Sequence, residues 1–161
     1  MTDDFAVLAV DHVGIAVPDL DAAIDFHCST FGLEVTHREI NEEQGVAEAM
    51  LSPVAATDRS STGGSSAGRS PAGGAAIQLL APLTPQSTIA AFIGRSGPGL
   101  QQLAYRVADV EAAAASLRSR GVRVLYAEAK VGTGGSLINF AHPKDTGGVL
   151  IELVQPAAQS E

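Results

Sequence analysis

The sequence is poor in residue types that many binding proteins and secreted proteins depend on. It has one cysteine, no tryptophan, two lysines and 4% aromatic residues, and its formal net charge is −8. The single Cys28 cannot form an internal disulfide, which agrees with a reducing compartment. So few aromatic side chains provide no stacking platform for bases, and the acidic balance disfavours nucleic acids and anionic membranes as partners.

Membrane signals are also missing. No apolar stretch approaches the roughly 20 residues that a membrane-spanning helix needs. The acidic start Met1–Asp4 lacks the positively charged segment that opens a signal peptide. The composition therefore predicts a cytoplasmic protein, and its 45% of hydrophobic residues is enough for a core at this length.

The most informative pattern in the sequence is an internal duplication. Asp11–Ala23 aligns with Gln101–Ala113, and Ile77–Pro82 aligns with Ile151–Pro156. Each half predicts the order strand, helix, strand, strand, strand, so the expected fold is α+β with two βαβββ modules. We expect the first module at residues 7–83, a connecting helix and turn at 84–99, and the second module at 100–156.

Local signals place the elements within these modules. Asp19 or Asp21 is a candidate N-cap for the first helix, which Gly32 ends. A Ser/Gly/Ala-rich segment at 55–74 predicts a flexible surface loop, with a lid over the site as the alternative. Strands are expected at 11–17, 33–39, 46–51, 75–80, 100–107, 122–127, 136–140 and 149–154, and further helices at 87–93 and 110–120.

Four polar residues occupy duplicated positions on the strands. His12 and Gln102 match in the opening strands, and Gln78 and Glu152 match in the closing strands. One interpretation is a solvated polar face, because alternate side chains of a strand point to opposite faces. Glu152, however, lies in the apolar run Val149–Val154, where a carboxylate requires a cation or several donors. Convergent imidazole, carboxylate and amide groups indicate instead a site for a divalent ion such as Co, Mn, Ni or Zn.

A family resemblance is carried by four motifs in order: Asp11–Asp19, Asn41–Glu48, Gln78–Leu83 and Asn139–Leu153. Together with the duplication, they resemble the methylmalonyl-CoA epimerase family of the vicinal oxygen chelate (glyoxalase–bleomycin resistance) superfamily. The resemblance extends from about Val10 to Gln155 and implies paired βαβββ modules that form a cupped mixed sheet around a metal site. It also implies an acyl-CoA thioester substrate and a homodimer.

The same resemblance assigns roles to individual residues. It implies a divalent metal ion, with cobalt favoured, bound by His12, Gln78, Gln102 and Glu152. It implies that Glu48 and Glu152 form an acid/base pair. The family usually carries His-His where this chain has Gln101-Gln102, so an amide oxygen would replace one imidazole ligand.

These roles suit epimerisation at C2 of methylmalonyl-CoA by 1,1-proton transfer through a metal-stabilised enolate. Two carboxylates on opposite faces of the carbon would remove the proton and return it. Glu48 shares a strand face with Val46 and Met50, and an exposed glutamate is the alternative. Lys144 and Lys130 are candidate contacts for a carboxylate or phosphate of the acyl-CoA, with ordinary surface charge as the alternative.

Other activities of the superfamily are alternatives to epimerisation. A glyoxalase I-like lyase resembles a pattern with a carboxylate where Gln78 stands. An extradiol dioxygenase needs two histidines and a carboxylate on iron, whereas only His12 is available at the ligand positions. A ligand-binding or drug-sequestering protein has no need for an opposed pair of carboxylates such as Glu48 and Glu152. The epimerase is therefore the favoured prediction.

Overall fold

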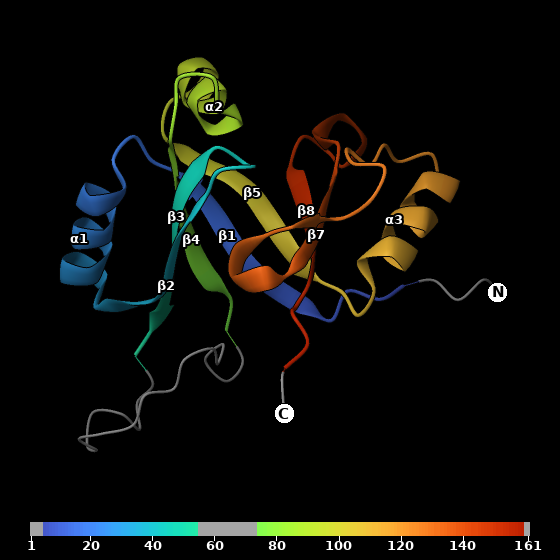
Figure 1. Cartoon of the computed structure of the whole chain (residues 1–161), viewed down its shortest axis with the longest axis horizontal. Coiled ribbons are helices and arrows are strands. Elements are labelled where there is room, and N and C mark those ends of the chain that lie inside the picture. The colour runs from blue at the N-terminus through green and yellow to red at the C-terminus, as the bar shows by residue number, and fades with distance from the viewer. Residues whose placement is uncertain (1–4, 55–73, 160–161) are drawn as a thin grey trace. The chain divides into compact units, whose positions relative to one another are not determined.

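The computed structural model of the chain describes residues 5–54 and 74–159, which form two compact units (Figure 1). One unit is Gly14–Leu100, and the other combines the residues up to Val13 with those from Gln101 onward. The loop predicted at 55–74 lies outside the described residues apart from Gly74. None of the helices in the described ranges is long and apolar enough to span a membrane.

The unit Gly14–Leu100 is built on antiparallel strands. Its elements are the end of β1 (Ala9–Ala16), α1 (Leu20–Phe31), β2 (Leu33–Asn41), β3 (Val46–Pro53), β4 (Ala76–Pro82) and α2 (Thr88–Ser96). The strand order is β2-β3-β4-β1, and β3 pairs antiparallel with both β2 and β4. Helix α1 packs against β2, β3 and β4, and α2 packs against β4.

Both ends of α1 follow the sequence signals. The side chain of Asp19, rather than that of Asp21, accepts a hydrogen bond from the Ala22 N–H at 2.9 Å. At the other end, Gly32 has a φ of 66° and its N–H bonds to the Cys28 carbonyl at 3.0 Å. Glycine adopts this left-handed conformation without a Cβ clash, so it ends the helix as predicted.

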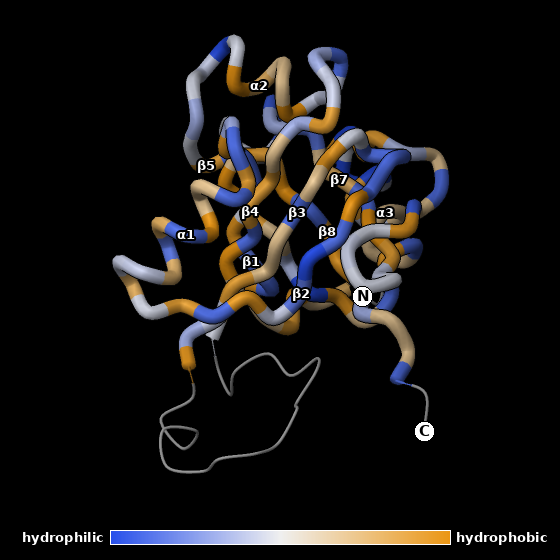
Figure 2. Tube along the Cα trace, turned by 60° about the vertical axis from the view of Figure 1, so that its left-hand side comes forward, coloured by the Kyte–Doolittle hydropathy of each residue, from blue (hydrophilic) through white to orange (hydrophobic). Residues whose placement is uncertain are grey.

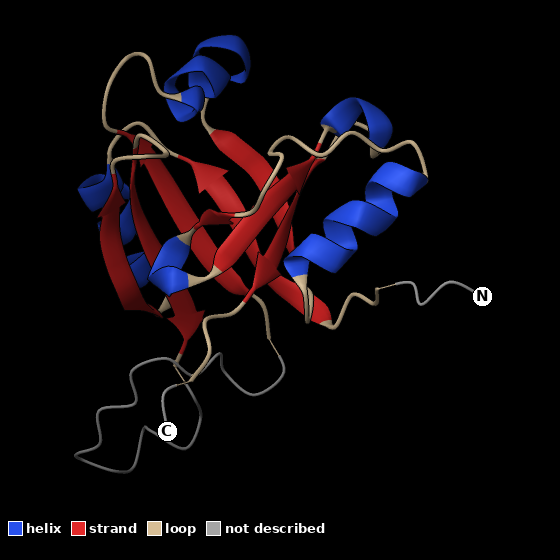
Figure 3. Ribbon diagram, turned by 45° about the vertical axis from the view of Figure 1, so that its right-hand side comes forward, coloured by secondary structure: helices blue, strands red, loops and turns tan. Residues whose placement is uncertain are grey.

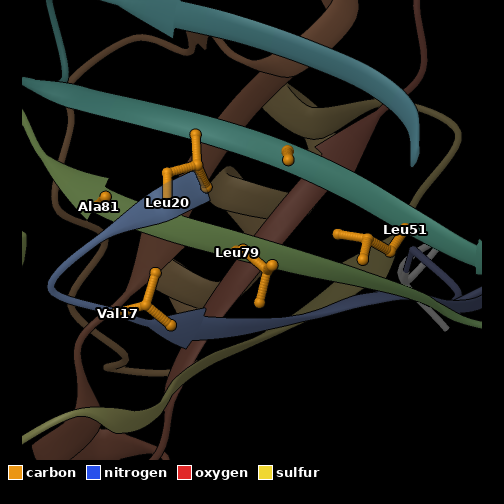
Figure 4. Packing of buried hydrophobic residues seen from close by; sticks show 6 residues of the cluster. Val17, Leu20, Leu51, Leu79 and Ala81 are labelled. Carbon is orange, nitrogen blue, oxygen red and sulfur yellow. The ribbon is translucent and has the colours of Figure 1, made fainter. Parts of the chain in front are cut away.

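The core of this unit lies between α1 and the sheet. Figure 4 shows Leu51 of β3 and Leu79 of β4, which belong to the same hydrophobic cluster as Val17 and Leu20. Leu51 and Leu79 have no exposed surface. Each buried leucine contributes about 1.5–3 kcal/mol of hydrophobic stabilisation. Hydrophobic and hydrophilic residues are mixed along the strands (Figure 2), and neighbouring positions of a strand face opposite ways. The even-numbered positions of β3 and β4 therefore face away from this core.

The other unit contains a mixed sheet. Its elements are β5 (Gly99–Arg106), α3 (Val110–Ser119), β6 (Lys130–Val131), β7 (Leu137–Ala141), β8 (Leu150–Gln155) and 3-10 turns at Thr133–Gly135 and Pro143–Asp145. The strand order is β1-β5-β8-β7-β6. β5 and β8 are parallel, whereas β7 is antiparallel to β8 and β6. Helix α3 packs against β7 and β8, as Figure 3 shows, and the α+β class predicted from the sequence is confirmed.

The strand predicted at 122–127 is wrong. This segment forms only an isolated bridge between Val124 and Ala141. A buried side chain takes the place of a strand ladder, because Asn139 accepts from the Tyr126 N–H at 3.1 Å and donates to the Tyr126 carbonyl at 3.0 Å. Arg118 of α3 donates to the same carbonyl at 2.5 Å. The carbonyl is therefore engaged by side chains rather than by a second strand.

Candidate active site

Three polar side chains meet inside the unit that contains β5 and β8. His12 of β1, Gln102 of β5 and Glu152 of β8 are only 3%, 8% and 5% exposed. The Glu152 Oε2 atom accepts a hydrogen bond from Gln102 Nε2 at 2.5 Å and lies 2.9 Å from His12 Nε2. Gln102 Nε2 lies 3.4 Å from His12 Nε2. The interpretation of these positions as a solvated strand face is therefore wrong.

Strand pairing explains why these residues converge. In the parallel register of β5 and β8, Gln102 is opposite Leu150 and Ala104 is opposite Glu152. Gln102 and Glu152 are thus diagonal neighbours on the same face of the sheet. β1 lies beside β5, with the Leu8 N–H donating to the Arg106 carbonyl at 2.9 Å. The three groups consequently come from three adjacent strands.

The imidazole of His12 has acidic partners on both of its nitrogens. Nδ1 lies 2.8 Å from Asp11 Oδ1, and Nε2 lies 2.9 Å from Glu152 Oε2. Burial lowers the pKa of His12, but the hydrogen bonds and charges of Asp11 and Glu152 outweigh it and raise that pKa to about 9. Burial alone would raise the pKa of Asp11. The hydrogen bonds and charges of His12 and Arg106 outweigh the effect of burial, so the pKa of Asp11 is lower than the ordinary value of 3.8.

The raised pKa of His12 makes the stability of the metal-free protein depend on pH. The folded-state pKa of about 9 exceeds the ordinary 6.5, so the contribution is complete below pH 6.5 and is lost as the pH rises to 9. We expect the loss of this contribution to lower the free energy of unfolding by roughly 3 kcal/mol between these two pH values. Urea unfolding at pH 6.5 and at pH 9, with a chelator present, measures the change.

Matched variants isolate the part that belongs to His12. His12→Gln should lose this pH-dependent difference. His37→Gln changes an exposed histidine on β2 and leaves the pairs of His12 intact, so it should keep the difference. Equal pH dependence in His12→Gln and the wild-type protein would contradict the assignment.

The other unit buries a second polar pair. Glu48 of β3 and Gln78 of β4 are each 3% exposed, and Gln78 Nε2 donates to Glu48 Oε2 at 2.8 Å. In the antiparallel register, Met50 is opposite Gln78 and Leu80 is opposite Glu48. Both polar side chains occupy the strand face opposite Leu79. The alternative of an exposed glutamate at position 48 is therefore wrong, and the amide donor stabilises a buried carboxylate.

Comparison with known proteins settles the family. The family described as Glyoxalase/Bleomycin resistance protein/Dioxygenase superfamily matches residues 11–140. The chain belongs to this superfamily. It has the α+β vicinal oxygen chelate fold of solved relatives, so the family resemblance seen in the sequence is confirmed.

Epimerases of acyl-CoA thioesters are among its relatives in the superfamily. Ethylmalonyl-CoA/methylmalonyl-CoA epimerase of Cereibacter sphaeroides is 34% identical over 91% of this chain and 96% of that protein. The crystal structure of methylmalonyl-CoA epimerase from Mycobacterium tuberculosis is 46% identical, with a TM-score of 0.81 over 98% of this chain and 93% of that one. A glutamate-to-glutamine variant of Streptomyces coelicolor methylmalonyl-CoA epimerase in complex with 2-nitronate-propionyl-CoA is 43% identical. It has a TM-score of 0.81 and covers 95% of this chain and 100% of that one.

Enzymes of this superfamily use a divalent metal ion, and the described residues can fit one only with the help of amide ligands. Among those residues, no group of three or more His, Cys, Asp or Glu side chains could hold a metal. His12 and Glu152 supply only one imidazole and one carboxylate, and amide side chains would complete the set. Gln102 already directs its amide at Glu152, and rotation of that amide would present its oxygen instead. Imidazole, carboxylate and amide ligands suit Co, Mn, Ni or Zn.

The two predicted substrate-binding lysines differ in their surroundings. Lys144 is exposed on the turn Pro143–Asp145. Its neighbour Asp145 is bound by Arg123 at 2.8 and 2.9 Å, and these hydrogen bonds hold the pKa of Asp145 well below its usual range. The ammonium of Lys130 lies 4.4 Å from the centre of the Tyr126 ring, a cation–π contact. Lys144 is therefore the better placed of the two to contact an anion from solution.

Asp11 and Arg106 are site residues whose contacts the sequence did not predict. Asp11 bonds to the candidate ligand His12, and Arg106 bonds to Asp11 at 2.9 Å. Alternation along a strand places neighbours such as Asp11 and His12 on opposite faces. No sequence pattern therefore indicated that their side chains would meet.

Proposed function

We propose that this protein is a metal-dependent epimerase that interconverts (2R)- and (2S)-methylmalonyl-CoA by 1,1-proton transfer. The observation that carries the proposal is the burial of a carboxylate in each unit, Glu48 and Glu152, beside polar groups suited to a metal site. Relatives at 43–46% identity are methylmalonyl-CoA epimerases. The nitronate in the Streptomyces coelicolor complex is a planar anion, as the enolate of this reaction is.

The C2 proton of methylmalonyl-CoA lies between a thioester and a carboxylate. Its removal leaves negative charge on oxygen, and a bound divalent ion would stabilise that charge as it develops. In the proposed reaction, the Glu48 carboxylate takes the proton from one face and leaves a planar enolate. Glu152 starts protonated and delivers its proton to the opposite face, which gives the other configuration and leaves Glu152 ionised and Glu48 protonated. The roles reverse for the other epimer.

Gln78 would contribute both to the metal site and to the surroundings of the proposed catalytic residue Glu48. Its Nε2 atom donates to Glu48, and the carbonyl oxygen is the atom of a glutamine side chain that can bind a cation. A glyoxalase I-like carboxylate at this position would place an ionised oxygen against Glu48, and two like charges at hydrogen-bond distance repel. The amide at position 78 therefore favours the epimerase over the lyase.

We propose cobalt as the first metal to test, followed by manganese, nickel and zinc. His12, Gln78, Gln102 and Glu152 would hold the ion. Gln102 offers a neutral amide where the family resemblance leads us to expect an imidazole, and a neutral amide binds late transition metals more weakly. Lys144 would contact the carboxylate or a phosphate of the substrate, and Lys130 is a second candidate for this contact.

Assembly and location are also proposals. We propose a homodimer, because twofold dimers are the commonest oligomers. We also propose a cytoplasmic location, because the free Cys28 agrees with a reducing compartment.

Deuterium exchange tests the proposed reaction directly. The protein is loaded with Co, Mn, Ni or Zn and incubated with methylmalonyl-CoA in deuterated water, and exchange at C2 is followed by mass spectrometry. We expect exchange and epimerisation with at least one metal and loss of both with chelator. Absence of exchange with all four metals would favour a ligand-binding protein instead.

A further inference from the structure

We propose that Asp11 and Arg106 form a positioning pair that fixes the tautomer of His12 and directs its Nε2 atom to the metal. The inference rests on the proposed function, because it assigns a role toward the metal site. Asp11 hydrogen-bonds to the proposed ligand His12, and Arg106 acts on His12 through its bonds to Asp11. Both are therefore positioning residues rather than ligands.

Hydrogen-bond geometry determines which nitrogen of His12 keeps its proton when the other nitrogen binds a metal. Asp11 Oδ1 lies 2.8 Å from His12 Nδ1, while Oδ2 accepts from both Nε and Nη2 of Arg106 at 2.9 Å. A carboxylate that receives two bonds from arginine is ionised and can only accept hydrogen bonds. The nitrogen that faces it, Nδ1, must therefore be the donor. Neutral His12 then has its lone pair on Nε2, which is the atom that faces Glu152 and Gln102.

Burial gives this arrangement its strength. The side chains of Asp11 and Arg106 are 16% and 31% exposed, and that of His12 is 4% exposed. Water therefore competes only weakly for these hydrogen bonds. A histidine ligand whose second nitrogen donates to a carboxylate is held in orientation and becomes a stronger ligand.

The internal duplication provides a natural comparison. Asp11 and His12 align with Gln101 and Gln102. The half that offers an imidazole has a carboxylate beside it, whereas the half that offers an amide has another amide. An amide ligand has no tautomer to fix, so it needs no acidic neighbour. In agreement, the buried Oε1 atom of Gln101 has no hydrogen-bond partner.

Asp11→Asn is the decisive substitution. Arg106 has only donors, so it will hold the Asn oxygen and turn the Asn NH2 group toward His12 Nδ1. That NH2 group requires an acceptor, which moves the histidine proton to Nε2, the tautomer that cannot bind metal there. We expect the affinity for Co²⁺, measured by calorimetry, to fall about 10- to 100-fold.

A double variant separates positioning from simple structural damage. In Asp11→Asn/Arg106→Met, no arginine holds the Asn oxygen, so the amide can turn and accept from Nδ1–H. We expect the double variant to bind Co²⁺ at least about fivefold more tightly than Asp11→Asn alone, a non-additive result. Asp145→Asn breaks the Arg123 pair in the same unit and should leave Co²⁺ affinity unchanged. Additive losses in the double variant would overturn the proposal.

The tautomer can also be observed in the unmodified protein. Nitrogen-15 NMR of the zinc-loaded wild-type protein should show His12 bound through Nε2 with a proton on Nδ1. Coordination through Nδ1 would overturn the proposal without any variant having to fold. Failure of the wild-type protein to bind any divalent ion would instead contradict the proposed metal site. Wild-type binding with an unchanged Asp11→Asn variant would contradict the positioning pair alone.

Discussion

Glu48→Gln should lower epimerase turnover by about 100-fold or more while leaving the fold and the affinity for Co²⁺ unchanged. The glutamine side chain has the same shape and can still accept the hydrogen bond from Gln78 Nε2, which lies 2.8 Å from the Glu48 carboxylate. It cannot accept the C2 proton. Epimerisation is measured by chiral analysis of methylmalonyl-CoA, and metal affinity by calorimetry.

The variant should also show a one-sided exchange pattern. If two carboxylates serve opposite faces of the carbon, loss of Glu48 leaves one epimer able to exchange its proton through Glu152 without inverting. The matched control is Glu34→Gln, the same chemical change at an exposed position on β2, which should keep full turnover. Near-normal epimerisation by Glu48→Gln would remove this residue from the mechanism.

Glu152→Gln should have a different effect, because this residue is proposed both to bind the metal and to carry a proton. Its carboxylate is 5% exposed and accepts from Gln102 at 2.5 Å. Replacing it with a neutral amide removes the single anionic ligand of the proposed set. We expect Co²⁺ affinity to fall about 100-fold or more, with loss of both epimerisation and exchange.

Comparison of the two variants tests the division of labour. Glu48→Gln should lose turnover and keep the metal, whereas Glu152→Gln should lose both. Glu128→Gln, at an exposed position of the same unit as Glu152, serves as the control and should bind Co²⁺ as the wild-type protein does. Unchanged metal affinity in Glu152→Gln would exclude Glu152 as a ligand.

Much of the fold and part of the candidate site could be predicted from the sequence, because the internal duplication is visible in it. Matching positions in the two halves identified His12, Gln102 and Glu152, and the structure brings these three side chains together. Capping signals placed the start and end of α1 correctly. Both kinds of signal depend on residue spacing alone, so no knowledge of distant contacts was needed.

The parts that could not be predicted depend on side chains from different segments that meet. They also depend on neighbours in one strand that meet although their side chains should face opposite ways. Residues 122–127 have the composition of a strand, but Asn139 and Arg118 bind the backbone of Tyr126 in place of a partner strand. The contact of Asp11 with His12 joins neighbours that alternation would separate. Whether the polar groups of the two units serve one substrate stays a prediction.

The division of β1 between the two units limits which fragments of this protein can fold alone. Leu8, next to the start of β1, donates a hydrogen bond to the carbonyl of Arg106 in the second half of the sequence. The other end of β1 belongs to the unit Gly14–Leu100. A fragment that stops before Gln101 would carry His12 away from Gln102 and Glu152 and leave one strand end without its hydrogen-bonding neighbour. A single repeat expressed alone should therefore aggregate or exchange this strand with a second copy.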